Sequence, residues 1–159
     1  EHCARVLPSL TWQPTETDAD MLAALAERVQ RAALPNLLAP LAFDVHRARR
    51  PIASAAAVFC SNMLHIAPWS ACPALLAHAE LCLAPGAPLV LYGPFKRAGE
   101  HTAPSNAAFD ADLRRPGGGG GKGNDQLAEL LPGFVFSVIN PTSVTITKDG
   151  SDGGPAEVT

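Results

Sequence analysis

The chain has 159 residues, of which 47% are hydrophobic and 17% are charged, so it can fold around a sizeable core. Its formal net charge of −3 excludes the basic excess that is typical of nucleic-acid-binding proteins. The apolar runs are far shorter than the ~18 residues that a membrane-spanning helix needs, and the pattern of a secretory signal is absent. We therefore expect one folded domain over residues 1–148 and a disordered tail over residues 149–159.

Four cysteines, Cys3, Cys60, Cys72 and Cys82, occur without a C-x-x-C pair. Cys60 and Cys82 lie in apolar runs and are expected to be small core residues. His78 and Cys82 could share a helix face, but two ligands do not make a zinc site, so we expect no metal. We expect a reduced protein in an intracellular compartment such as the cytoplasm.

Strand-like and helix-like segments alternate along the first two thirds of the chain, which predicts βαβ units and a mostly parallel sheet. The strand candidates are Leu10–Gln13, which ends at Pro14, then Leu37–Val45, Ala55–Cys60 and Ala87–Tyr92. The helix candidates are Glu1–Leu7, a helix capped at Thr17 that reaches about Ala32, and Ala71–Leu83. The link between the second and third strands leaves room for only a reduced or irregular helix.

The remainder of the chain predicts smaller elements. A short helix is expected over Ser105–Arg114, with Ser105 as its cap, and another over Asn124–Leu131. Between them, Pro116–Gly123 reads P-G-G-G-G-G-K-G and is expected to be a flexible loop. Phe134–Ile139 and Ser143–Lys148 are typical of an antiparallel hairpin.

The glycine run formally matches two phosphate-binding motifs, and we reject both. Gly118, Gly120 and Gly123 have the spacing of a dinucleotide fingerprint, but no strand precedes them. Gly121-Lys122 fails as a P-loop, because Gly123 stands where Ser or Thr must hold magnesium. A nicotinamide-dependent oxidoreductase is therefore disfavoured.

The stretch Ala55–Ile66 is the centre of the functional interpretation. Its first half is a continuous apolar run, which predicts a strand buried on both faces in the middle of a parallel sheet. Polar Ser61, Asn62 and His65 follow where this strand should end, and ligands of such sheets bind just beyond the carboxyl ends of the strands. The alternative is that Asn62 and His65 only cap the strand and bond to loop backbone.

Two acidic residues follow the preceding strand candidates. Glu16 could accept hydrogen bonds from both ribose hydroxyls of an adenosine ligand, or it could be an ordinary charge near a helix N-terminus. Asp44 could accept from the exocyclic amine of adenine, or it could form a turn. If Glu16, Asp44 and Asn62 end three successive strands, one crevice would collect all three.

The next strand end offers groups for a small substrate. Tyr92 ends the strand, Phe95 follows it, and Asn106 lies near the start of the helix beyond. Aromatic and amide side chains at this edge suit a small acceptor molecule. For Phe95 the alternative is plain packing under the loop.

Six ordered motifs over residues 1–114 carry a resemblance to a known family. They are Trp12-Gln13-Pro14-Thr15-Glu16, Leu34-Pro35-Asn36, Phe43-Asp44-Val45, Val58–Ile66 (V-F-C-S-N-M-L-H-I), Tyr92-Gly93-Pro94-Phe95 and Ser105–Asp110 (S-N-A-A-F-D). Together they resemble a poorly characterised family of class I S-adenosylmethionine-dependent methyltransferases, often labelled methyltransferase-like or domain of unknown function. The family patterns are W-x-P-S-D, L-D-V, N-x-x-H-I, Y-G-P-F and S-N-x-x-F-D.

The resemblance implies a Rossmann-like α/β sheet in three αβα layers, with a C-terminal antiparallel hairpin and S-adenosylmethionine across the strand ends. Glu16 would take the ribose-binding position, and Asp44 and Val45 would flank the adenine. Asn62 and His65 would line the floor near the methionine part and the acceptor. The acceptor would be a small molecule, and neither nucleic acid nor a membrane is implied as a partner.

One family element has almost no counterpart in this sequence. The family has a first strand followed by a glycine loop, G-x-G-x-G-[QE]-H, of which only Glu1-His2 matches the tail. We therefore expect a truncated methyltransferase-like domain over residues 1–148, inactive and weak in donor binding by itself. The alternative is a non-catalytic remnant that acts as a binding or scaffold protein.

Overall fold

The computed structural model describes residues 1–47, 51–97, 100–115, 134–140 and 143–148. The chain divides into two compact units, Glu1–Pro51 and Ile52–Thr159, and each is described by itself. The expected glycine loop at Pro116–Gly123, the expected helix at Asn124–Leu131 and the expected tail from residue 149 lie outside the described residues.

The first unit contains two short parallel strands and two helices. The elements are α1 (His2–Val6), β1 (Thr15–Glu16), α2 (Ala19–Ala32) and β2 (Leu41–Ala42). In the ladder, Thr15 lies opposite Leu41 and Glu16 opposite Ala42. The Phe43 N–H donates to the Glu16 carbonyl at 2.9 Å, which extends the pairing to the residues just before Asp44. The predicted parallel pairing of the first two strands is confirmed.

The predicted end of the first strand at Pro14 is wrong, because the ladder continues through the proline. The Pro14 carbonyl accepts from the Leu41 N–H at 3.0 Å, although Pro14 has no N–H of its own to donate. The side-chain amide of Gln13 compensates by donating to the Ala39 carbonyl at 2.7 Å. A neighbouring side chain thus supplies the donor that the proline lacks, and the regular strand lies at Thr15–Glu16.

The cap of α2 is Asp18 and not the predicted Thr17. The Asp18 carboxylate accepts from the Met21 N–H at 2.9 Å, while the Thr17 N–H donates to the Glu16 carboxylate at 2.7 Å. At the other end, Ala33 adopts left-handed backbone with φ 48°, so the helix ends at Ala32, as predicted.

Asp18→Ala is expected to lower the free energy of unfolding by about 1 kcal/mol, because the Met21 N–H loses its acceptor at the helix start. Urea denaturation followed by circular dichroism measures this change. Asp20→Ala is the control: Asp20 also lies in the first turn, where its charge contributes only about 0.3–0.5 kcal/mol. Equal losses for both variants would show that Asp18 acts only as a charge.

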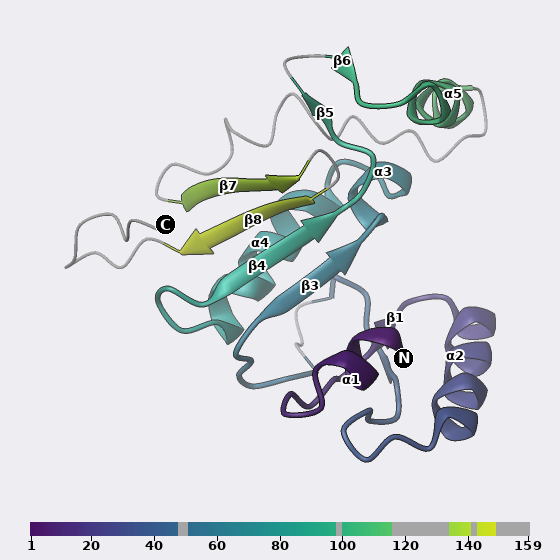
Figure 1. Ribbon diagram of the computed structural model, residues 1–159, viewed down its shortest axis with the longest axis vertical. Coiled ribbons are helices and arrows are strands. Elements are labelled where there is room, and N and C mark those ends of the chain that lie inside the picture. The colour runs from purple at the N-terminus through teal and green to yellow at the C-terminus, as the bar shows by residue number, and fades with distance from the viewer. Residues whose placement is uncertain (48–50, 98–99, 116–133, 141–142, 149–159) are drawn as a thin grey trace. The chain divides into compact units, whose positions relative to one another are not determined.

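The second unit contains a four-stranded sheet (Figure 1). Its order is β3 (Val58–Ser61), β4 (Pro88–Tyr92), β8 (Ser143–Lys148) and β7 (Phe134–Asn140). β3 and β4 are parallel, with Ser61 opposite Tyr92, so their carboxyl ends lie side by side. β8 runs antiparallel to both β4 and β7, which confirms the predicted C-terminal hairpin.

The core of this unit lies between β4 and the helix α4 (Ala71–Cys82). Leu89 and Leu91 alternate along β4 and are each 1% exposed. α4 runs behind the sheet in the view of Figure 1. Its buried residues recur at helical spacing: Ala71, Cys72, Leu75, Leu76 and Ala79. The predicted helix at Ala71–Leu83 is confirmed, because Leu83 forms its C-cap.

The prediction that Ala55–Cys60 is a strand buried on both faces is wrong. The strand begins at Val58, and its exposure alternates, with Val58 and Cys60 half-buried and Phe59 49% exposed. In the four-stranded sheet that the structure describes, β3 pairs with β4 on one side only. An apolar run therefore identified the strand but not its place in the sheet.

The cysteines are free; Cys72 is buried, and Cys60 is half-buried. Burial raises the pKa of the Cys60 thiol on β3 to about 11, although the Met63 N–H opposes this shift. Burial also raises the pKa of Cys72 on α4 to about 11. Both thiols are therefore protonated at neutral pH.

The remaining elements are short. They are α3 (Met63–Ile66), β5 (Lys96–Arg97), β6 (Glu100–His101) and α5 (Pro104–Leu113). Ser105 is not the cap of α5, because Ala103 is the N-cap and Pro104 occupies the first turn without a side-chain cap. The described residues of the short link between β2 and β3 form turns and contain no helix.

The longest helix in the described part of the chain is α2, with 14 residues, whereas a bilayer-spanning helix takes about 20 apolar residues. None of the described helices could therefore cross a membrane.

Candidate functional site

The carboxyl ends of β3 and β4 are tied together by Asn62. Asn62 directly follows β3 and adopts left-handed backbone, with φ 59° and ψ −14°. Asparagine tolerates this conformation better than most residues with a side chain. The Asn62 N–H donates to the Tyr92 carbonyl at 2.8 Å, and the chain then turns into α3. Asn62 therefore lies at the carboxyl end of β3, where the sequence predicted a ligand site.

His65 lies in α3 and is almost fully buried behind Asn62. The residue is 7% exposed, and its backbone N–H donates to the Asn62 carbonyl at 3.0 Å. The ring meets the Phe95 ring edge to face, with 4.7 Å between centroids and 67° between planes. Among the described residues, Nε2 of His65 is buried and has no hydrogen-bond partner.

The His65 ring occupies the space that a side chain at residue 93 would fill, and glycine leaves this space open. A Cβ at Gly93 would overlap Nε2 and Cδ2 of His65 and would lie 3.5 Å from the Asn62 side-chain oxygen. Gly93 follows β4 directly, so the backbone of one strand end forms a wall for the side chains of the other. Sequence reasoning quoted Gly93 within a motif but gave it no role, since the contact spans residues far apart in the chain.

Burial lowers the pKa of His65, and the charge of Asp110 opposes this shift. His65 is therefore neutral near pH 7 and can accept a proton. Asp110 on α5 accepts two hydrogen bonds from Arg114, at 2.8 and 3.2 Å, and its carboxylate lies 3.5 Å from His101. The pKa of Asp110 is lowered, first by the hydrogen bond from Arg114, so it is an anion at neutral pH.

The three residues that the sequence predicted to bind a small acceptor have different surroundings. Phe95 is buried against His65, so the packing alternative describes at least part of its role. Tyr92 is 45% exposed at the end of β4. The side chain of Asn106 donates to the Thr102 hydroxyl at 2.9 Å, which fixes the residues before α5. Asn106 thus has a structural partner of its own.

Glu16 lies in the first unit, at the end of β1, and one of its oxygens is already engaged. Oε1 of Glu16 accepts from the Thr17 N–H at 2.7 Å and from the Asp18 N–H at 3.1 Å. These bonds orient the carboxylate at the start of α2. Because a carboxylate has two oxygens, Oε2 can still accept from a ligand.

Asp44 follows β2 and forms a turn with the next residues. Its Oδ1 accepts from the His46 N–H at 2.9 Å and lies 3.2 Å from the His46 ring, while Oδ2 lies 3.6 Å from Arg47. The pKa of Asp44 is lowered, first by the His46 N–H, so it is ionised at neutral pH. These contacts are those of a turn-forming aspartate, the alternative that the sequence offered for Asp44. Val45, the next residue, is half-buried.

The structure thus brings Asn62, His65 and Phe95 together with Gly93 at one edge of the second unit. Glu16 and Asp44 follow neighbouring parallel strands of the first unit. The meeting of the two acids with Asn62 in one crevice stays a prediction. Among the described residues, no group of three or more His, Cys, Asp or Glu side chains gathers as metal ligands.

Solved structures with a similar fold include S-adenosylmethionine-dependent methyltransferases and a cyclase. The apo S-adenosylmethionine-dependent methyltransferase SibL matches with a TM-score of 0.71 and 18% identity over 94% of this chain and 46% of its own. An O-methyltransferase family protein from Burkholderia thailandensis matches with a TM-score of 0.66 and 18% identity, over 94% of this chain and 47% of its own. The [4+2]-cyclase SpnF matches with a TM-score of 0.59 and 18% identity, over 84% of this chain and 46% of its own.

These matches show that the chain has the Rossmann-like α/β fold of methyltransferases, as the sequence predicted. The chain spans about half the length of the structures it matches. Residues 1–123 match the model of a family described as a protein of unknown function, DUF938, and the chain belongs to that family.

Proposed function

We propose that this chain is part of an S-adenosylmethionine-dependent methyltransferase that acts on a small acceptor molecule. The single observation that supports this most is the edge shared by β3 and β4. There, Asn62 and a buried, neutral His65 lie beside Gly93, at the strand ends where such folds bind ligands. The methyltransferase fold of the chain agrees with this assignment.

Each part of the donor would have its own binding residues. Glu16 would hold the ribose hydroxyls through Oε2, while its Oε1 keeps the bonds to the start of α2. Asp44 and Val45 would flank the adenine. Asn62 would contact the methionine part, and Tyr92, Phe95 and Asn106 would line the acceptor side.

The chemistry would be direct transfer of the methyl group from the donor sulfonium to a nucleophile on the acceptor. Such a transfer depends mainly on alignment of the two reacting atoms. If the acceptor nucleophile carries a proton, His65 can take it, because burial keeps the imidazole neutral. His65 would then become a cation, and the nearby charge of Asp110 would stabilise it.

The donor site of this chain by itself is proposed to be incomplete. In the resembled family a glycine loop lets backbone approach the methionine part, and residues 1–159 contain only the tail of that loop at Glu1-His2. We therefore expect the chain as given to bind S-adenosylmethionine weakly. Calorimetry that gave a micromolar dissociation constant for this chain would contradict the incomplete site.

The test is donor binding by a version joined to a strand and glycine loop ahead of Glu1. Asn62→Gly keeps the left-handed backbone but removes the amide, so it should weaken donor binding about tenfold without unfolding the protein. Glu16→Gln should weaken binding by about tenfold or more, because a charged acceptor for the ribose is lost. Glu27→Gln, on the exposed side of α2, is the matched control and should leave binding unchanged.

Two results would overturn the proposal. One is tight donor binding that neither Asn62→Gly nor Glu16→Gln weakens relative to the Glu27→Gln control. The other is no donor binding by the completed version, which would instead favour a non-catalytic binding or scaffold protein. If the completed version binds the donor, production of S-adenosylhomocysteine with a panel of small alcohols, phenols and amines identifies the acceptor class.

A further inference from the structure

Asp110 is an acidic residue whose charge acts on His65, the proposed base. It lies on α5, which packs against α3, the short helix that carries His65. The hydrogen bond from Arg114 lowers the pKa of Asp110, so this carboxylate is an anion throughout the pH range in which an imidazole titrates. Its charge therefore stays constant while His65 gains or loses a proton.

The charge of Asp110 is compensated by groups from three elements. Arg114, at the C-cap of α5, donates to both carboxylate oxygens, from Nε to Oδ2 at 2.8 Å and from Nη2 to Oδ1 at 3.2 Å. Nε2 of His101 on β6 lies 3.5 Å from Oδ2. The positive charge of Lys96 on β5 also lowers the pKa of Asp110, but less than Arg114 does. Arg114 is therefore the main partner of this anion.

This compensation matters for His65 as a base. A general base has to be uncharged before the reaction and has to carry a proton after it. An uncompensated carboxylate near an imidazole favours the protonated form, which would leave the base already charged at neutral pH. At His65 burial outweighs the charge of Asp110, so the pKa of His65 is lowered. The two hydrogen bonds from Arg114 account for this order, because its positive charge cancels part of the carboxylate field at the imidazole.

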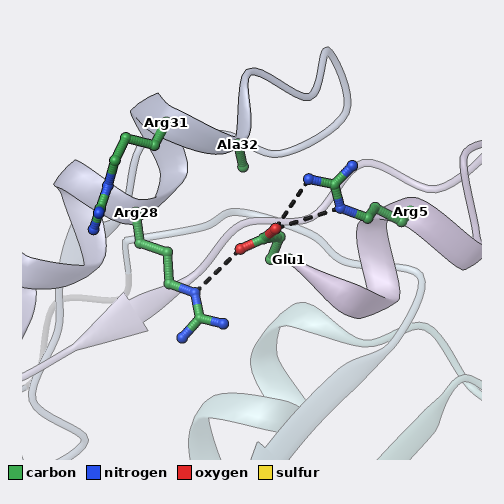
Figure 2. A pocket seen from close by; sticks show the side chains of 5 residues that line it. All are labelled: Glu1, Arg5, Arg28, Arg31 and Ala32. Atoms are coloured by element: carbon green, nitrogen blue, oxygen red, sulfur yellow. Dashed lines mark hydrogen bonds and ion pairs between the residues drawn. The ribbon is translucent and has the colours of Figure 1, made fainter.

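The pair of Asp110 and Arg114 contributes little to stability. Its partners are four residues apart at the end of a helix, and the Arg114 side chain is 55% exposed. Figure 2 shows an ion pair of the same spacing in the first unit, where Arg5 donates to Glu1 at 3.0 Å. The pair on α5 is distinguished by the buried imidazole on which the charge of Asp110 acts.

We propose that Arg114 is a positioning residue that acts on His65 through Asp110. By cancelling part of the carboxylate charge, Arg114 keeps His65 uncharged at neutral pH, while Asp110 still stabilises the cation that forms during the reaction. The proton passes from the acceptor nucleophile to the imidazole and then to solvent, and the methyl group takes its place on the nucleophile. This inference rests on the proposed function, which assigns His65 as the base.

Titration of the chain between about pH 4.5 and 8.5, followed by nuclear magnetic resonance, tests this link. The imidazole resonances are assigned with His65→Gln and His101→Gln. Arg114→Gln should raise the proton affinity of the His65 imidazole about three- to tenfold, because the charge of Asp110 is then uncompensated. Asp110→Asn should lower it about threefold or more. Arg114→Lys keeps the positive charge and should stay within about twofold of the wild type.

Arg115→Gln is the matched control. Arg115 is the next residue along the chain, and it pairs with Asp112 at 3.0 Å through a side chain that is 75% exposed. Its loss should change the proton affinity of His65 less than about 1.5-fold, because solvent screens this charge. The double variant Asp110→Asn/Arg114→Gln should titrate like Asp110→Asn alone, since Arg114 without its carboxylate extends into solvent.

Three results would overturn the proposal. The first is an unchanged or lower proton affinity of His65 in Arg114→Gln, and the second is an equal effect of Arg115→Gln, which would indicate general surface charge. The third is an equal rise with and without Asp110, which would show that Arg114 acts directly. The opposite sign for Asp110→Asn keeps the test informative if Arg114→Gln unfolds. The titration needs neither donor nor acceptor, so its failure leaves the methyltransferase proposal standing, and failure of donor binding leaves this electrostatic link intact.

Discussion

Replacing Gly93 with alanine is expected to lower the free energy of unfolding by about 1–3 kcal/mol, with loss of the ordered position of His65. The added Cβ would overlap the His65 ring, which cannot retreat because it packs against Phe95 and is almost fully buried. Urea denaturation measures the stability. The imidazole proton resonances, assigned by comparison with His65→Gln, report the position of the ring.

Gly86→Ala separates this steric effect from the general cost of replacing glycine. Gly86 has a φ of 79° and open space around it, so alanine there meets backbone strain of about 1 kcal/mol and no clash. It should leave the His65 resonances unchanged. If Gly93→Ala also left them unchanged, Gly93 would not form the wall behind the ring.

His65 is expected to make the protein less stable as the pH falls below about 6.5. Its folded pKa is lowered by burial, so between the unfolded pKa and the lower folded pKa only the unfolded chain takes up a proton. The free energy of unfolding therefore decreases as the pH falls through this window and levels off below the folded pKa. Each pKa unit between the two states contributes about 1.4 kcal/mol.

The difference in stability between the wild type and His65→Gln isolates this contribution. That difference should shrink or change sign as the pH is lowered from 7.5 to 5. The carboxylates with lowered pKa values, Asp44 and Asp110, act in a separate window below about pH 4. A difference that stays constant from pH 7.5 to 5 would mean that His65 is solvated or partnered when protonated.

Local sequence patterns predicted those elements that a single stretch of the chain specifies. The apolar run that contains Leu89 and Leu91 and the periodic residues of α4 identified the strand and helix that form the core. The hairpin of β7 and β8 followed from two short strand-like runs and a turn. In each case the signal lies within one continuous segment.

Features that depend on distant neighbours could not be predicted from such patterns. Pro14 indicated a strand end, and only the contact between Gln13 and Ala39, 26 residues away, lets the ladder continue. The run Ala55–Cys60 has the composition of a doubly buried strand, but its exposure depends on which strands lie beside it. The same limit applies to the candidate site. Asn62 and His65 were predicted from their position after a strand, and their role stays a prediction, whereas the contact of Gly93 with His65 joins residues far apart in the chain.

The raised pKa values of the Cys60 and Cys72 thiols allow opening of the second unit to be followed by chemical labelling. With pKa values of about 11, only about one thiol in 10⁴ is a reactive thiolate at pH 7, and reagents such as maleimides react through the thiolate. Opening of the second unit returns both groups to ordinary reactivity. The rate at which label is incorporated at these two positions therefore measures how often β3 and α4 open transiently.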